Sequence, residues 1–323
     1  MSARVDCGAR AAAYVPRMTA LLQAALGAAI ALASPAPPVA AHSADDSLAA
    51  RVERRIAEVP GAVVGLAFRD LGRDDAFDVA SDSVFHAAST MKVPVMIELI
   101  RQAEAGSAAL DQRVLLVNQF GSIVDGSPYA LDPTDDSDSA MYALVGQRVA
   151  VRELMTRMIT RSSNLATNAV IALVGAARVD ATAHALGATR TRVLRGVEDQ
   201  KAYDRGMNNV TTAGDLATLM SAIALDRAAS PAGCALMRDV LSRQEFNDEI
   251  PAGLPPGTRV AHKTGQITGV LHDAAIVYPS GRPPYVLVVL TRGIPDERVA
   301  RALIADLSRL VWAHATVGAT AAR

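Results

Sequence analysis

Residues 259–293 read "RVAHKTGQITGVLHDAAIVYPSGRPPYVLVVLTRG" and contain three strand-like runs. Apolar and β-branched residues dominate the runs 259–265, 272–279 and 285–293, and glycine- or proline-containing turns separate them. Short turns between strands favour antiparallel neighbours. This stretch therefore predicts most of a sheet.

A second group of strand-like residues lies near the other end of the chain. The runs 62–70 and 76–80 flank a glycine-containing turn and predict a β-hairpin. A single antiparallel sheet built from both ends would bring residues 61–80 next to 259–292. Amphipathic helices predicted at 45–59 and 296–315 would cover this sheet.

The middle of the chain has helical periodicity, so the sequence predicts an α+β fold with an additional all-helical lobe. We expect one catalytic domain over residues 42–323. Its sheet lobe comprises 45–88 and 211–315, and its helical lobe spans about 89–210.

The N-terminus has the pattern of a secretory signal. Arginines precede an apolar run at 18–33, and small residues with breakers follow at 34–43. We expect 1–41 to be removed by cleavage near Ala41, which leaves an exported protein, periplasmic or secreted, with no membrane span after processing. An uncleaved anchor is the alternative, although the run is short for a span. Met18 is an alternative start.

Composition excludes several classes of function. The 32 Lys and Arg residues nearly balance the 33 Asp and Glu residues, which disfavours a nucleic-acid partner. Cys234 alone would remain after processing, and its small apolar neighbours indicate a buried residue. The six histidines are scattered, so neither a metal site nor a Ser-His-Asp enzyme is supported, and no cofactor is implied.

Residues 89–92 read "STMK" at the predicted start of a helix. Ser89 and Lys92 are three residues apart and share a helix face. Burial would lower the pKa of Lys92, and the neutral amine could then take the proton of Ser89 to produce a nucleophile. The motif alone is weak, because serine and lysine at this spacing are common.

Two further stretches strengthen this interpretation: "SSN" at 162–164 opens a predicted helix, and "KTG" at 263–265 ends a predicted strand. S-x-x-K, S-x-N and K-T-G in this order resemble the class A β-lactamase and penicillin-binding-protein family. The resemblance covers nearly all of 45–315. It implies a monomeric serine β-lactamase that hydrolyses the amide of β-lactams through an acyl-enzyme.

The resemblance also implies roles for individual residues in forming the acyl-enzyme. Ser89 is the expected nucleophile, Lys92 its proton partner and Ser162 the proton shuttle to the lactam nitrogen. The other residues of the motifs are expected to bind substrate. Asn164 would donate to its side-chain amide, Lys263 and Thr264 would hold its carboxylate, Gly265 would permit close approach, and the backbone N–H groups of Ser89 and Gln266 would form the oxyanion hole.

Hydrolysis of the acyl-enzyme requires a carboxylate that activates water, and the loop "RGVEDQKAYDRGMNN" at 195–209 lies where the family places it. Glu198 is the first candidate and Asp199 the second. Asn168 is expected to brace this loop. A solvated loop charge is the alternative interpretation of both carboxylates.

This loop and the second motif depart from the family pattern. Ala202 stands where an asparagine helps to hold the water, Ser163 replaces the aspartate of S-D-N, and Asn209 replaces an aspartate that anchors the loop. The alternative function is therefore a related acyl-serine hydrolase with little lactam turnover: a D-Ala-D-Ala peptidase, an esterase or a lactam-binding protein.

Residues 106–147 predict a long exposed insertion with solvated acidic residues. A lip over the cleft that disfavours anionic substrates is the alternative. Arg259 or Arg292 is expected to supply a second positive group for the substrate carboxylate.

Overall fold

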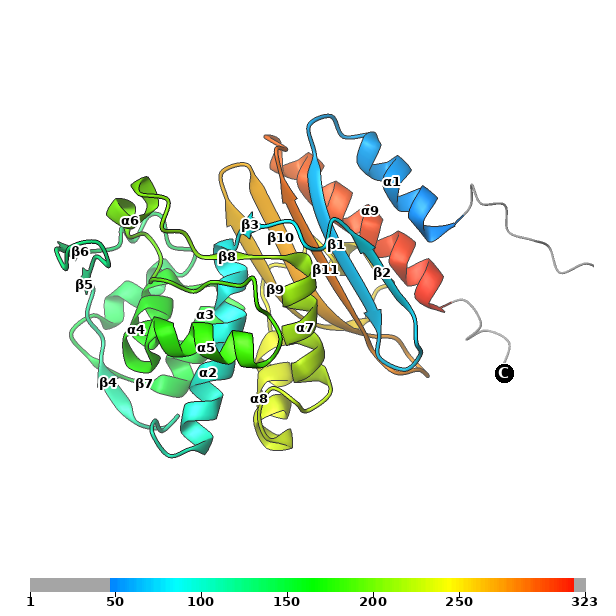
Figure 1. The fold of residues 1–323 in the computed structure, drawn as a ribbon. Helices are drawn as coiled ribbons and strands as arrows, with labels where there is room; N and C mark the ends of the chain where they lie inside the picture. The colour runs from blue at the N-terminus through cyan, green and yellow to red at the C-terminus, as the bar shows by residue number, and fades with distance from the viewer. Residues whose placement is uncertain (1–46, 317–323) are drawn as a thin grey trace, which may run out of the picture. The chain divides into compact units, whose positions relative to one another are not determined.

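The computed structural model describes residues 47–316, and the predicted signal segment lies outside them. Its centre is a five-stranded antiparallel sheet (Figure 1). The strands are β1 (Val63–Asp70), β2 (Ala76–Val79), β9 (Arg259–Ile267), β10 (Val270–Tyr278) and β11 (Tyr285–Arg292). Their order, β2-β1-β11-β10-β9, confirms the predicted sheet from both ends of the chain.

The two ends of the chain meet where β1 pairs with β11. In this register Val63 lies opposite Arg292, and Asp70 lies opposite Tyr285. On its other side β11 pairs with β10, and β10 pairs with β9 through a tight turn at Gly269, whose φ of 71° suits glycine. β9 is consequently an edge strand of the sheet.

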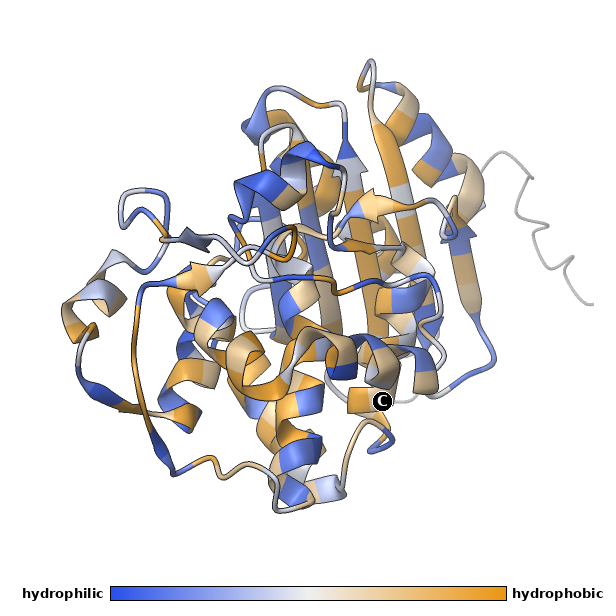
Figure 2. Ribbon diagram, turned by 60° about the vertical axis from the view of Figure 1, so that its left-hand side comes forward, coloured by the Kyte–Doolittle hydropathy of each residue, from blue (hydrophilic) through white to orange (hydrophobic). Residues whose placement is uncertain are grey.

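Helices cover both faces of the sheet. On one face α1 (Leu48–Ala57) and α9 (Glu297–Thr316) lie side by side over a cluster that includes Phe68, Leu287 and Leu303 (Figure 1). On the other face α7 (Ala213–Ala224) packs against β1, β10 and β11, and α8 (Pro231–Leu241) packs against α7 and β9. Because both faces are covered, β10 and β11 are apolar along most of their length (Figure 2).

The helical lobe surrounds α2 (Lys92–Glu104), which is buried along most of its length. α2 contacts α3 (Val151–Thr160), α4 (Asn164–Val174), α5 (Ala176–Ala185) and α8. The predicted helix start at Ser89 is a 3₁₀ turn, η2 (Ala88–Met91), that leads directly into α2 and packs against β9. Pro94 lies in the first turn of α2, where no intrahelical N–H bond is lost.

Within the described residues no single helix is long and apolar enough to cross a membrane; α4 and α5 pass such a test only together, with an 82° bend between them.

Short elements complete the chain. Between residues 47 and 316 three small antiparallel pairs form, and the remaining pieces are short helices of one or two turns. They are β3 (Phe85–His86) with β8 (Val210–Thr211), β4 (Arg113–Leu115) with β7 (Arg148–Ala150), β5 (Phe120–Gly121) with β6 (Pro128–Tyr129), η3 (Ser139–Leu144), α6 (Gln200–Asp204) and η4 (Pro251–Gly253).

The segment 106–147 is more integrated than the sequence predicted. Leu116 and Met141 are fully buried, and Asp136 and Asp138 are only 6% and 4% exposed. The expectation that all its acidic residues are solvated was wrong, because these two accept hydrogen bonds from α4 and α3.

Candidate active site

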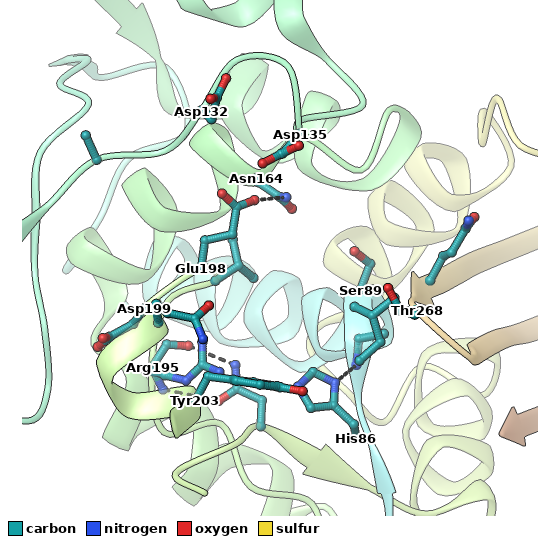
Figure 3. Close-up of a pocket in the computed structure, with 17 residues that line it drawn as sticks. His86, Ser89, Asp132, Asp135, Asn164, Arg195, Glu198, Asp199, Tyr203 and Thr268 are labelled. Carbon is teal, nitrogen blue, oxygen red and sulfur yellow. Dashed lines mark hydrogen bonds between the residues drawn. The ribbon is translucent and has the colours of Figure 1, made fainter. Parts of the chain in front are cut away.

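Ser89 lies at the floor of an open cleft (Figure 3). Two adjoining cavities of about 570 and 710 Å³ share Ser89, Asn164 and residues 266–268 in their walls. Ala88 precedes Ser89 with a φ of 45°, and its N–H donates to His86 Nδ1 at 3.0 Å. Within the described chain the Ser89 hydroxyl makes no hydrogen bond, which leaves it available to an incoming electrophile.

Lys92 is fully buried beneath this floor. Its Nζ donates to the Ser162 carbonyl at 2.7 Å, to Ser162 Oγ at 3.1 Å and to Asn164 Oδ1 at 2.9 Å. Lys92 therefore contacts the second motif, and the bond to Ser89 that its helical spacing had suggested does not form. Burial, helped by the charge of Lys263, lowers the pKa of Lys92 well below its ordinary value, which favours the neutral amine.

Ser162 connects the two lysines of the site. Its Oγ accepts from Lys92 Nζ at 3.1 Å and from Lys263 Nζ at 3.0 Å. The residue has a φ of 56°, a conformation that a non-glycine residue keeps only when its surroundings hold it. Lys263 comes from the edge strand β9 and is fully buried, and burial lowers its pKa to about 7.

Glycine suits the position where β9 passes close to Ser89. A side chain at Gly265 would place its Cβ 3.2 Å from the Ser89 nitrogen and 3.1 Å from the Thr90 nitrogen. Those are backbone atoms of η2, which would have to shift by a few tenths of an ångström to admit a side chain. The K-T-G motif therefore brings Thr264 and Gln266, both of which line the cleft, close to Ser89.

The N-terminus of α4 is fixed by two side chains. Ser163 caps the helix by accepting from the Ala166 N–H at 3.2 Å. Asp136 accepts from the Asn164 and Leu165 N–H groups, both at 2.9 Å. A buried carboxylate at this position is favoured by the helix dipole, and it complements Ser163, which stands where the family has aspartate.

Glu198 faces Ser89 from the opposite wall (Figure 3). Its Oε1 accepts from Asn164 Nδ2 at 2.6 Å. The side chain is accessible from the open cleft, yet partial desolvation, together with the charges of Asp136 and Asp135, raises the pKa of its carboxyl. Asn164 thus links Glu198 on one wall to Lys92 on the other.

The loop that carries Glu198 is held by hydrogen bonds between its two ends and at the residue before Glu198. Asn209 Oδ1 accepts from the Leu194 and Arg195 N–H groups at 2.8 and 3.2 Å. Asn168 exchanges two hydrogen bonds with the Val197 backbone, at 2.7 and 3.0 Å. The asparagines thus occupy positions from which they anchor the loop.

Asp199 is a poor candidate for the base, because it is 1% exposed and points away from Ser89 (Figure 3). Its oxygens accept from Ser122 Oγ at 2.8 Å, the Ile123 N–H at 2.9 Å and the Ala202 N–H at 3.2 Å.

Comparison with known proteins decides the family. A family model described as the beta-lactamase enzyme family matches residues 47–315. The chain belongs to the beta-lactamase enzyme family.

Known relatives match this chain over most of their own length. A beta-lactamase of Streptomyces albus G is 27% identical over 311 residues, which cover 92% of this chain and 96% of the relative. Beta-lactamase AST-1 of Nocardia asteroides is 28% identical over 78% of both chains.

Solved structures of the same type also match. PBP-A is 29% identical with a TM-score of 0.71, covering 83% of this chain and 95% of PBP-A. An ancestral class A β-lactamase is 26% identical with a TM-score of 0.73, covering 83% and 100%. These matches confirm the predicted resemblance and its α+β fold.

In this member of the beta-lactamase enzyme family, the two arginines proposed for the substrate carboxylate lie elsewhere. Arg292 lies over the Phe85 ring and donates to the Val84 carbonyl, and Arg259 lies over the Tyr278 ring. Both guanidiniums are occupied by these contacts, and neither residue lines the cleft described above.

Arg301 lines the same cleft as Thr264 and was missed. It donates to Gln266 Oε1 at 3.2 Å and pairs with Glu249 at 3.3 Å. Asp136 was missed as well. No spacing in the sequence connects α9 or the 106–147 segment with the three motifs, so neither residue had a detectable signal.

Proposed function

We propose that this protein is a serine β-lactamase that hydrolyses the amide of β-lactam antibiotics through an acyl-enzyme on Ser89. One observation carries the proposal: the unbonded Ser89 hydroxyl lines the same cleft as Ser162, which two buried lysines contact, and as the Glu198 carboxylate on the other wall. Beta-lactamase is the printed name of the relatives that support this substrate class.

Acylation begins with proton transfer from Ser89 to the neutral Lys92 amine. Ser89 Oγ bonds to the lactam carbonyl carbon, and backbone N–H groups of Ser89 and Gln266 stabilise the oxyanion. The carbon–nitrogen bond then breaks, and the proton passes through Ser162 to the leaving nitrogen. Lys263 and Thr264 hold the substrate carboxylate during these steps.

Deacylation uses the opposite wall. Glu198 takes a proton from a water molecule whose oxygen attacks the ester carbonyl carbon. The bond from that carbon to Ser89 Oγ breaks, and Glu198 returns its proton to Oγ, which regenerates both groups. Because the raised pKa of Glu198 brings it closer to working pH, its carboxylate is a stronger base than an ordinary glutamate.

The proposal is tested by measuring both hydrolysis of a β-lactam and covalent labelling of Ser89. We expect the purified protein to hydrolyse nitrocefin and to carry a transient adduct on Ser89 detectable by mass spectrometry after rapid acid quenching. Ser89→Ala should show neither. A protein that forms no adduct and turns nothing over would contradict the proposal.

A related acyl-serine hydrolase with slow lactam turnover is the second candidate, and specific observations favour it. Ala202 cannot donate a side-chain hydrogen bond to a deacylating water, and a point mutant of PBP-A, a structural neighbour, was solved as an acyl-enzyme complex with penicillin-G. A stable Ser89 adduct together with release of D-alanine from a D-Ala-D-Ala peptide would support this alternative.

We also propose that the protein is exported and monomeric. The charge and apolar pattern of 1–41 supports the first statement. The mass of the protein recovered from the periplasm or medium should correspond to cleavage near Ala41, and light scattering should give the mass of one chain. Recovery of the full-length chain from membranes would contradict export with cleavage.

A further inference from the structure

We propose that Asp199 and Ser122 are positioning residues for Glu198, and that the β5–β6 hairpin holds the water-activating carboxylate in place. This inference rests on the proposed function, because it assigns the support of one step in that reaction. Neither residue touches the reacting atoms.

The backbone of Glu198 needs external support. Its φ is 61°, which costs an L-residue of this size free energy unless the surroundings fix it. The preceding residue is held by Asn168 and by Tyr129, whose hydroxyl donates to the Val197 carbonyl at 3.3 Å. The strained residue therefore lies between two fixed neighbours, and Asp199 is the second.

Asp199 is fixed by the hairpin and not by its own loop alone. Ser122 Oγ and the Ile123 N–H, both from the hairpin, donate to its two oxygens at 2.8 and 2.9 Å. Ser122 is 5% exposed, so these bonds are shielded from water. Lys201 also reaches Asp125 and Ser127 at the hairpin tip, but this contact is exposed to solvent and contributes little to holding the loop.

Ala202 contributes only its backbone to the support of Asp199. Ala202 is fully buried and offers only its backbone N–H, which donates to Asp199 at 3.2 Å. Burial alone would raise the pKa of Asp199, but hydrogen bonds from Ile123, Ser122 and Ala202 hold it below its ordinary value. The carboxylate thus stays ionised and keeps its acceptors for the hairpin.

The experiment separates acylation from deacylation in Ser122→Ala and Asp199→Asn, using stopped-flow burst kinetics and mass spectrometry of the Ser89 adduct. We expect deacylation to fall by about ten- to a hundredfold, since small displacements of a catalytic group have effects of this size. Acylation should change by less than about twofold, because no group of its wall is altered. The adduct should therefore accumulate in both variants.

Two matched controls lie on the same elements. Ser127→Ala removes a hydroxyl from the same hairpin without touching Asp199, and Asp204→Asn removes an equal charge from the other end of α6. Both should deacylate like the unmodified protein. Ser122→Thr retains the hydroxyl and should restore most of the rate.

The pH profile distinguishes positioning from general loss of stability. A loosened loop admits water to Glu198, so its pKa falls toward the ordinary value and the acid limb of deacylation moves to lower pH. Equal losses in acylation and deacylation, or equal losses in the controls, would overturn the proposal.

Hydrogen exchange keeps the test independent of the chemistry. Amides 197–202 should exchange faster in Ser122→Ala than in Ser127→Ala. Equal exchange in the two variants would contradict the proposal that the hairpin holds the loop. If the unmodified protein forms no Ser89 adduct, the proposed function fails, while the exchange result still decides whether the hairpin holds the loop.

Discussion

The two walls of the cleft are built differently. On one wall Lys92 begins a buried helix and Lys263 lies in a strand, and both side chains are fully buried. On the other wall Glu198 is in a loop, has a positive φ and remains accessible. Regular backbone fixes the first wall, whereas side chains from distant segments fix the second.

For the proposed reaction, this difference indicates that acylation and deacylation depend on different parts of the chain. The acylating groups are held by hydrogen-bonded elements whose geometry survives single surface changes. The deacylating group depends on a few contacts from Asn164, Asn168 and the β5–β6 hairpin. In the proposed mechanism, substitutions around the second wall should therefore change the lifetime of the acyl-enzyme more than its formation.

Lys92→Ala should have the largest effect. Without the amine, Ser89 has no proton acceptor and Ser162 loses a donor, so acylation should fall by about a thousandfold. The rate of adduct formation on Ser89 measures it. Lys201→Ala, which removes an exposed lysine from the other wall, is the control, and equal acylation rates in the two variants would contradict the role of Lys92.

Glu198→Gln should sharpen the contrast between the walls. We expect acylation to persist and deacylation to fall by at least about a hundredfold, because the amide cannot accept a proton from water. Single-turnover kinetics with a penicillin separates the two rates. Unchanged deacylation would remove Glu198 from the mechanism.

Asp136→Asn tests how the N-terminus of α4, which carries Asn164 between the two walls, is held in place. Losing the charge beneath the two N–H groups of α4 should lower the free energy of unfolding by about 2 kcal/mol, measured by urea denaturation. It should also lower the pKa of Glu198, which the Asp136 charge raises, so the acid limb of deacylation should move to lower pH. Asp135→Asn, an exposed neighbour, should leave stability unchanged.

The lowered pKa of Lys263 predicts that kcat/KM for an anionic lactam depends on pH. Its pKa of about 7 means that the ammonium is present below pH 7 and lost above it. For an anionic lactam, kcat/KM should therefore fall above pH 7, approaching about tenfold per pH unit. The methyl ester of the same lactam lacks the carboxylate and should not show this fall. Lys263→Arg stays protonated and should flatten the profile.

Removing the acidic residues at the rim of the cleft should have the smallest effect of these changes. Asp132 and Asp135 are exposed at the cleft, so replacing both by asparagine should lower KM for a doubly anionic lactam by about two- to threefold. Salt should reduce this change. A cationic lactam should respond in the opposite direction, and identical responses to both substrates would exclude a lip effect.

Much of the first wall could be predicted because periodicity and short motifs encode it. The runs around Lys263 alternate between strand and turn, and Ser89 and Lys92 are close in sequence. The second wall could not be predicted to the same degree. Ser122 and Asp199 are far apart in the chain, and only the folded backbone brings their side chains within 2.8 Å.

Helical spacing was also a limited guide at Lys92. It predicted a contact with Ser89, whereas the Lys92 amine contacts three acceptors of the second motif. Likewise, acidic residues in a loop are usually exposed to solvent. Asp136 is buried instead, because N–H groups at the start of α4 donate hydrogen bonds to its carboxylate.

The pairing of β1 with β11 has a consequence for how the protein is made. Val63 cannot find its partner Arg292 until nearly the whole chain has been synthesised, because almost every other element lies between them. Such distant contacts slow folding through the entropy of closing a long loop. A nascent chain would thus remain unfolded until late, a state compatible with threading through a translocation channel, and truncation before residue 285 should leave a product that aggregates through the bare edge of β1.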